Sequence, residues 1–344
     1  MATDDGGRSA ALALAGAHEA TAWGEPTFRV RNTLFAILPA TPHGKGRLPV
    51  WIKGAGALME SLPRRRRRCG PPFRPWPAHL AVLALLLPVA ASPGLAQVAA
   101  DPIPRHESFT LESRAVGDTR RINVYTPPTY AAVQEALPVV YMPDGGMAED
   151  FPHIANTLDS LIRLGRIRPV VLVGIENTER RRDLTGPTTV ASDSAVAPRV
   201  GGSAAFRAFL RDELMPEIGR RYRVTDERGL VGESLAGLFV VETLVLEPTL
   251  FRHYIAVDPS LWWNGGALVA TARIRLAALA GLGRTLYLTA AGERGNGAST
   301  ERLVEVYRAH APSGFAWVYE PRPDLQHATI FRATLPGAFA RVLR

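Results

Sequence analysis

Cysteine is almost absent from this chain of 344 residues. The single one, Cys69, lies ahead of the part of the sequence that has the pattern of a folded domain. Residues 97–344 therefore contain no disulfide, no thiolate nucleophile and no cysteine-ligated zinc. That composition is compatible with an oxidising compartment, and it gives no reason to expect a metal ion or another cofactor.

Lysine is nearly as scarce, and both lysines, Lys45 and Lys53, belong to the first part of the chain. Residues 1–96 carry 12 basic against 5 acidic side chains, whereas residues 97–344 carry 28 against 27. The overall charge of +8 is thus concentrated ahead of the domain. A balanced domain lacks the basic footprint of a nucleic-acid-binding protein, so nucleic acid is not expected as a partner.

Apolar runs long enough to cross a bilayer are missing as well. The apolar run from His79 to Ala91 is too short for a stable span. It follows the basic run Arg64–Arg68 and precedes the small-residue site Gly94-Leu-Ala96. Residues 59–96 therefore have the three parts of a secretory signal, which predicts a periplasmic or secreted protein with no stable membrane span after signal removal. A basic nucleic-acid-binding or targeting patch and a retained membrane anchor are the alternatives.

Residues 1–58 precede this signal and show no steady hydrophobic period. A secretory signal normally begins a chain, so we interpret this segment as a disordered extension or a mis-assigned start.

From about Phe109 onward, apolar runs alternate with amphipathic stretches, which is typical of an α/β sheet. We predict one domain over 97–344 with a mostly parallel sheet and helices on both faces. The expected strands are 108–113, 121–126, 137–142, 169–175, 228–231, 254–257, 285–290 and 315–319. The expected helices are 147–164, 204–222, 235–246, 266–280, 299–310 and 328–343. Residues 177–203 lack a clear period and predict a long functional or mobile loop.

The run Gly232-Glu-Ser-Leu-Ala-Gly237 stands between a predicted strand and a predicted helix. It resembles the Gly-x-Ser-x-Gly nucleophile elbow, in which a sharp turn holds a serine hydroxyl out at the carboxyl edge of the sheet. Small residues at 232 and 237 would let strand and helix pass closely. Ser234 is therefore the candidate nucleophile, and the N–H of Leu235 is a candidate oxyanion donor. A turn serine that caps a helix is the alternative.

A serine nucleophile of this kind needs a base and an acid, in the chain order serine, acid, histidine. His327 follows the last predicted strand and is the expected general base. Glu293 follows the strand before it and is the preferred acid, with Asp324 and Asp258 as alternatives. A second oxyanion donor is expected in the loop after strand 137–142, at Gly145 and Gly146, although these glycines could instead form only a β-turn.

Two stretches, 232–239 and 251–264, resemble the enterochelin-esterase-like branch of the α/β-hydrolases, a group of esterases related to esterase D. Residues 180–188, ahead of 201–203, and residues 137–145 are similar to further stretches of that family. The resemblance covers roughly residues 105–343.

The resemblance implies the α/β-hydrolase fold for residues 97–344 and hydrolysis of carboxylic esters, with Ser234 as nucleophile and His327 as base. The acid varies in this family, and some members work mainly as a serine–histidine pair. The chain departs from the commonest family patterns at Glu233, where histidine is frequent, and at Asp258, where serine or alanine is frequent.

Arg181 and Arg182 are predicted to bind an anionic or catecholate-like substrate group, and Trp262 and Trp263 to offer a flat apolar wall. Solvated arginines and core tryptophans are the alternatives. The leading functional hypothesis is a serine esterase that acts on a small-molecule ester, with siderophore-type lactones among the candidates. An acyltransferase on the same scaffold and a catalytically inactive binding protein are the other hypotheses.

Overall fold

The computed structural model describes residues 17–22, 25–30, 33–37, 51–52, 103–195, 197–292 and 296–344. The predicted signal at 59–96 lies outside these residues. Within 1–58, where the sequence predicted no regular structure, four short strands form a separate sheet in the order β1-β2-β3-β4. Their bounds are Ala17–Ala22, Glu25–Val30, Thr33–Ile37 and Trp51–Ile52.

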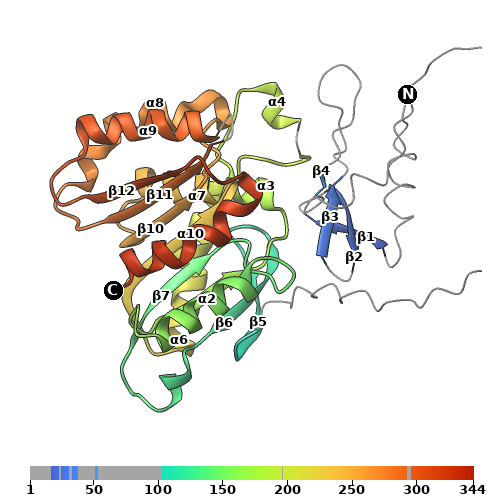
Figure 1. Ribbon diagram of the computed structural model, residues 1–344, viewed down its shortest axis with the longest axis vertical. Coiled ribbons are helices and arrows are strands. Elements are labelled where there is room, and N and C mark those ends of the chain that lie inside the picture. Colours follow the sequence, from blue (N-terminus) through green and yellow to red (C-terminus); the bar gives the residue numbers. More distant parts are fainter. Residues whose placement is uncertain are drawn as a thin grey trace, which may run out of the picture. The chain divides into compact units, whose positions relative to one another are not determined.

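The domain that follows is built on an eight-stranded sheet with the order β12-β11-β10-β9-β7-β8-β6-β5 (Figure 1). Strands β7 to β12 are all parallel, while β6 runs antiparallel to both of its neighbours. The predicted mostly parallel sheet is therefore confirmed. The strands are β5 (His106–Ser113), β6 (Asp118–Tyr125), β7 (Leu137–Met142), β8 (Val171–Ile175), β9 (Val224–Glu233), β10 (His253–Val257), β11 (Thr285–Ala291) and β12 (Ala316–Arg322).

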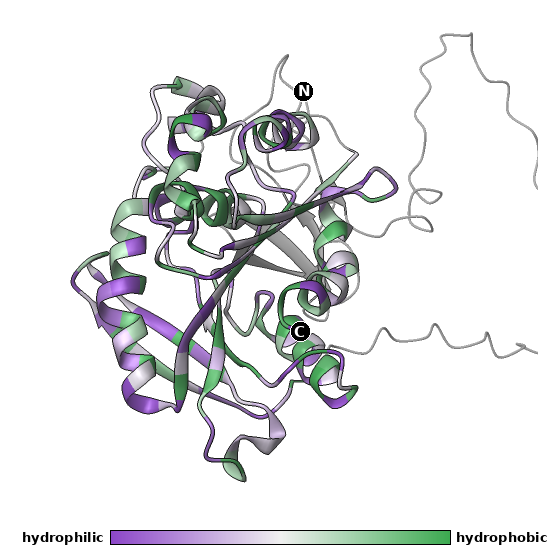
Figure 2. Cartoon of the chain, turned by 90° about the vertical axis from the view of Figure 1, so that its left-hand side faces the viewer, coloured by the Kyte–Doolittle hydropathy of each residue, from purple (hydrophilic) through white to green (hydrophobic). Residues whose placement is uncertain are grey.

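Helices cover both faces of this sheet, as the sequence predicts. Alternation along each strand sends successive side chains to opposite faces, so Ile255 and Val257 of β10 pack in one hydrophobic cluster while Tyr254 and Ala256 pack in the other. The first cluster includes α2 (Phe151–Arg163) and α10 (His327–Val342). The second includes α5 (Ser203–Ala208), η3 (Phe209–Leu214), α6 (Met215–Arg221), α7 (Leu235–Leu246), α8 (Trp263–Arg275), η4 (Leu276–Leu279) and α9 (Asn296–His310). Figure 2 shows the mixture of hydrophobic and hydrophilic residues along the outer helices.

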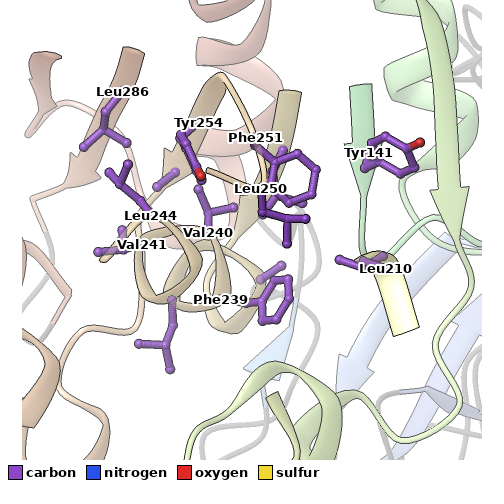
Figure 3. Packing of buried hydrophobic residues seen from close by; sticks show 14 of the residues in the cluster. Tyr141, Leu210, Phe239, Val240, Val241, Leu244, Leu250, Phe251, Tyr254 and Leu286 are labelled. Carbon is purple, nitrogen blue, oxygen red and sulfur yellow. The ribbon is translucent and has the colours of Figure 1, made fainter. Parts of the chain in front are cut away.

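Helix α7 differs from the others because it is apolar all round. Every residue from Leu235 to Val245 is buried, including Glu242, whose carboxylate accepts a 2.6 Å hydrogen bond from Arg207. Figure 3 shows side chains of α7 on several sides of the helix, among them Phe239 and Leu244. A helix enclosed in this way provides a rigid support for the residue that precedes it, Ser234.

Two segments differ from the sequence prediction in detail. The helix predicted over 204–222 is present, but residues 209–214 are π-helical. Pro216 follows two residues after Leu214 and has no N–H to give, which accounts for the widened turn before it. The loop predicted over 177–203 contains two short helices, α3 (Arg180–Leu184) and α4 (Ala191–Ser194). Among the described residues, no helix combines the length and apolarity needed to cross a membrane.

Candidate active site

Ser234 occupies a strained turn between β9 and α7, with φ 59° and ψ −118°. A non-glycine residue rarely adopts such a conformation, which must be held by its surroundings. The N–H of Ser234 donates to Val257 O at 3.1 Å, and its carbonyl oxygen accepts from the N–H groups of Leu238 at 2.8 Å and Ser260 at 3.0 Å. Both backbone groups are thereby fixed to β10 and its following loop. The predicted nucleophile elbow has the geometry expected of it.

The glycines around Ser234 are required by close packing. A Cβ on Gly232 would lie 2.7 Å from the Cβ of Ala236, and a Cβ on Gly237 would lie 3.0 Å from Val257 O. A contact of 2.7 Å is not tolerated, and one of 3.0 Å requires the neighbouring backbone to shift, so the predicted need for small residues at 232 and 237 is confirmed. The motif departs from strict Gly-x-Ser-x-Gly, because its fifth residue is Ala236 and the second glycine follows it.

The carboxylate beside His327 belongs to Asp258. His327 begins α10, and its Nδ1 lies 2.5 Å from Oδ2 of Asp258, which follows β10 directly. The other carboxylate oxygen accepts the N–H of Ala291 at 3.0 Å, and Asn296 Nδ2 donates to Oδ2 at 3.1 Å. Burial alone would raise the pKa of Asp258, but the hydrogen bonds from His327, Ala291 and Asn296 outweigh it and hold the pKa below its usual value.

Asp258 was one of the alternatives to the acid that the sequence favoured, Glu293. Glu293 lies outside the described residues, so its assignment stays a prediction, whereas Asp258 is the carboxylate bonded to Nδ1 of His327. The other alternative, Asp324, is exposed and bonded to Arg322 at 2.9 and 2.7 Å. The sequence signal for Asp258 was its place directly after a strand, but the left-handed φ of 42° that turns its carboxylate toward β11 and His327 has no signature in the sequence.

Strand register brings this pair to the elbow. Val257 of β10 is paired with Glu233 of β9, so Asp258 and Ser234, the residues that follow each of them, are at the same end of adjacent parallel strands. The side chain of His327 is 40% exposed, so the imidazole is accessible from outside. Sequence reasoning missed one further neighbour, Ser260, whose Oγ lies 3.3 Å from Oγ of Ser234.

Glu233, the residue before Ser234, is partly buried. Burial raises the pKa of its carboxyl group to about 8, although the positive charges of His327 and Arg180 oppose this shift. A carboxyl group with such a pKa is mostly neutral at pH 7.

The two glycines predicted as oxyanion donors do not present bare N–H groups here. The N–H of Gly145 donates to Ile175 O at 2.9 Å, and a Cβ at this position would lie 2.3 Å from Gly174 Cα, so this glycine serves the contact with β8. The N–H of Gly146 donates to Oε2 of Glu149 at 2.7 Å. The prediction that Gly145 is an oxyanion donor is therefore wrong, because its N–H is bonded to Ile175. The N–H of Gly146 is bonded to the side chain of Glu149. Leu235 begins α7, as predicted.

The Glu149 side chain at this donor is itself strongly perturbed. Burial, with a contribution from nearby Asp144, raises the pKa of its carboxyl group to about 7, while hydrogen bonds from Gly146 and Asn177 oppose the shift. Asn177 Nδ2 donates to Oε1 of Glu149 at 2.8 Å and to Oδ1 of Asp144 at 2.5 Å.

The predicted arginine cluster is part of internal ion pairs. Arg180 makes two hydrogen bonds to Asp144, at 2.6 and 2.8 Å, and reaches Glu233 O at 3.4 Å. Arg180 therefore connects the loop that contains Gly145 and Gly146 to the turn at Ser234. Arg182 is a correction to the prediction of an anion-binding group, because three carboxylates surround it, those of Asp118, Glu179 and Asp183. Arg181, on the same short helix α3, is partly buried.

The two tryptophans have different environments. Trp263 is 4% exposed and its Nε1 donates to Gly186 O at 2.8 Å, so the prediction that it forms a substrate wall is wrong. Trp262 is 40% exposed and its Nε1 donates to Oδ1 of Asn296 at 2.8 Å. Only Trp262 of the pair has a ring surface that a substrate could reach.

Comparison with known proteins identifies relatives of this chain. A family model described as "Putative esterase" matches residues 113–286, just over half of the chain. The chain is 33% identical over 182 residues to the ferri-bacillibactin esterase BesA of Bacillus subtilis and 29% identical over 185 residues to the siderophore triacetylfusarinine C esterase of Aspergillus fumigatus. These matches cover 47% and 50% of this chain, and 61% of each relative.

The structural comparison agrees with the sequence comparison. The crystal structure of an IroE-like serine hydrolase from Shewanella oneidensis superposes with a TM-score of 0.64 at 27% sequence identity. The superposition covers 69% of this chain and 79% of that one. The α/β-hydrolase fold implied by the sequence resemblance is thereby confirmed.

Proposed function

Because this chain belongs to the esterase family whose model it matches, we propose that it is a serine esterase that hydrolyses carboxylic esters through an acyl-enzyme on Ser234. The observation that carries the proposal is the pairing of His327 with buried Asp258 at the strand end beside the strained elbow. Acyl transfer by a serine hydrolase uses a serine on a strained turn, an imidazole held by a carboxylate and the N–H groups of a helix N-terminus. All three are found at this edge of the sheet.

In the proposed mechanism, Asp258 accepts a hydrogen bond from Nδ1–H of His327, which leaves Nε2 as the basic nitrogen. His327 removes the proton of Ser234 as the hydroxyl oxygen attacks the ester carbonyl carbon. The tetrahedral intermediate collapses to the acyl-enzyme, and the imidazolium returns the proton to the departing alcohol. Water then attacks the carbonyl of the acyl-enzyme while His327 removes its proton. Collapse of the second tetrahedral intermediate returns that proton to Ser234 and releases the carboxylic acid.

The developing oxyanion needs donors, and the N–H of Leu235 at the start of α7 is the first. The N–H of Gly146 is the second in this proposal, which requires Glu149 to give up its bond when substrate enters. Donors that are aligned before the reaction are typically worth a hundredfold or more in rate.

A siderophore-type lactone is the proposed substrate class. The names of the relatives support it, as both are esterases of iron-binding ligands. The exposed ring of Trp262 offers a flat apolar surface for an aromatic group. Since Arg182 is already paired with carboxylates, we do not assign the recognition of anionic groups to it. The signal at 59–96 supports a periplasmic or secreted enzyme.

The experiment has two parts. A fluorophosphonate probe should label the wild-type protein and fail to label Ser234→Ala, and p-nitrophenyl esters and a catecholate trilactone should both be hydrolysed by the wild type only. The expected loss for Ser234→Ala is about a thousandfold or more. A folded wild type that neither reacts with the probe nor turns over any ester would be a binding protein. Transfer of the acyl group to an added alcohol in preference to water would make it an acyltransferase.

A further inference from the structure

Asn296 connects the proposed acid to an exposed aromatic side chain. It is the first residue of α9, and its Nδ2 donates both to the carbonyl oxygen of Asp258, at 2.9 Å, and to Oδ2 of the Asp258 carboxylate, at 3.1 Å. Its Oδ1 accepts the indole N–H of Trp262 at 2.8 Å. Since Asp258 Oδ2 is also the atom bonded to His327, the hydrogen bonds run without a break from Trp262 to the imidazole.

The donors and acceptors in this chain permit only one orientation of the Asn296 amide. The indole N–H of Trp262 can only donate, so the group that faces it must be an oxygen. The amide nitrogen is then directed at Asp258, where both receiving atoms are acceptors. A rotation of the amide by 180° would set nitrogen against the indole N–H and oxygen against a carboxylate, with two repulsive contacts in place of attractive ones.

The Asn296 bond also acts on the oxygen that holds the base. Oδ2 of Asp258 receives hydrogen bonds from both His327 and Asn296, while Oδ1 receives the N–H of Ala291. The amide therefore spreads the carboxylate charge over a second donor and fixes the plane of the carboxylate. Without the bond from Asn296, the carboxylate of Asp258 could rotate, and the imidazole of His327 would be less well aligned. The carboxylate would also direct more of its negative charge at His327 and so hold the imidazolium proton more tightly.

We propose that Asn296 is a positioning residue for the Asp258–His327 pair and that Trp262 fixes the orientation of its amide. The inference rests on the proposed esterase function. It gives Trp262 two roles, because its ring is exposed to a substrate while its N–H supports the acid. Trp262 thereby connects the surface that a bound ester would contact to Asp258, the residue that orients His327.

The test is a double-mutant cycle with Asn296→Ala, Trp262→Phe and the double variant. The phenylalanine keeps an aromatic ring and removes only the N–H. On p-nitrophenyl acetate, Asn296→Ala should lower kcat/KM about tenfold, the worth of one hydrogen bond to a charged group, and Trp262→Phe a few-fold. In both, the acidic limb of the pH profile should move to higher pH. Because Trp262 acts through Asn296, the double variant should match Asn296→Ala.

Trp263→Phe is the matched control, because it also loses an indole hydrogen bond, the one to Gly186, outside this chain of contacts. It should lower Tm while the pH profile stays in place. The proposal is overturned if the effects of Asn296→Ala and Trp262→Phe multiply in the double variant, if Trp262→Phe changes KM alone, or if Asn296→Ala leaves the acidic limb unmoved. Trp262→Phe alters a surface position, so its profile decides the matter even if Asn296→Ala unfolds.

The failure of this proposal can be told from failure of the proposed function. If the wild type neither labels with the fluorophosphonate nor hydrolyses any ester, the esterase function fails and the positioning role fails with it. If the wild type is active and the three variants retain its pH profile, only the positioning role is lost.

Discussion

At the scale of single residues, the sequence predicts best where function depends on local backbone geometry. Ser234 was found from small residues on either side of it, and the structure has both the left-handed turn and the close packing that those residues imply. The choice among Glu293, Asp324 and Asp258 was harder, because it depends on which strand ends lie beside His327, and the structure brings Asp258 to the imidazole. Asp258 reaches the imidazole through a positive φ and a strand register, and neither is visible in the sequence.

The role of Asp258 can be tested by Asp258→Asn. An amide in place of the carboxylate cannot stabilise an imidazolium and favours the wrong tautomer, so kcat should fall by a factor of about 10² to 10⁴ while the fold is retained. Steady-state kinetics on one p-nitrophenyl ester at one pH provide the measurement. Asp324→Asn, in which an exposed carboxylate bonded to Arg322 is changed, should remain within about twofold of wild type. The reverse ranking of the two variants would remove Asp258 from the site.

Glu233 gives a prediction on stability. Its folded-state pKa of about 8 lies above the ordinary value of 4.5, so the folded protein holds this proton more tightly than the unfolded chain. The contribution of Glu233 to stability therefore falls as the pH rises from about 4.5 to about 8. Glutamine at this position is neutral at every pH. Glu233→Gln should therefore raise Tm at pH 8 by roughly 2–4 °C for each kcal/mol of ionisation cost that it removes, and have little effect at pH 5.

Thermal unfolding of wild type and variant at pH 5, 6, 7 and 8 would test this. Glu135→Gln, at an exposed loop position, is the control and should not alter the pH dependence of Tm. An equal Tm difference at all four values would show that the ionisation of Glu233 does not affect stability.

At the scale of elements, the predicted strands and long helices are confirmed, because apolar runs and amphipathic stretches mark them in the sequence. The short helices α3 and α4 were not predicted, since their positions depend on contacts with distant residues rather than on a period. Asp193 of α4 accepts the N–H of Asn264 at 2.8 Å. Arg182 of α3, for example, bonds to Asp118 of β6 at 2.8 Å. Such contacts between distant parts of the chain leave no pattern in a single sequence.

The junction of β9 and α7 is the element that presents Ser234, the proposed nucleophile, and Gly232→Ala tests its packing. The added Cβ would lie 2.6 Å from the backbone carbon of Ala236, so strand and helix must separate. We expect a loss of about 1–3 kcal/mol, as for other overpacked sites, and a fall in kcat because Ser234 moves with the helix. Gly219→Ala is the matched control: this glycine of α6 has nothing within 4 Å of the new methyl group, and alanine favours helix. A Gly232→Ala protein as stable and active as Gly219→Ala would contradict this account of the elbow.

At the scale of the whole molecule, the layered architecture followed from the alternation of strands and helices, while the order of the strands did not. The sequence shows that two faces must be covered but not that β7 lies between β8 and β9. The order matters for function, because it sets β9 and β10 side by side and so brings Ser234, Asp258 and His327 to the same edge.

The described core predicts that residues 97–344 fold and act without the preceding segment. Both hydrophobic clusters are formed by residues from Phe109 onward, and all eight strands of the large sheet begin at His106 or later. We expect the 97–344 fragment to keep its Tm within about 3 °C of the full-length chain, which corresponds to about 1 kcal/mol, and its kcat within about twofold.

A second fragment, 127–344, provides the contrast: it lacks β5 and β6, and with them Ile122, Val124 and Tyr125 of the core, and leaves the edge of β8 unpaired. It should aggregate or unfold cooperatively at a much lower temperature. Thermal unfolding and ester turnover of the three proteins side by side make the comparison, and a 97–344 fragment that unfolds like 127–344 would mean that the first 96 residues are part of the folded enzyme.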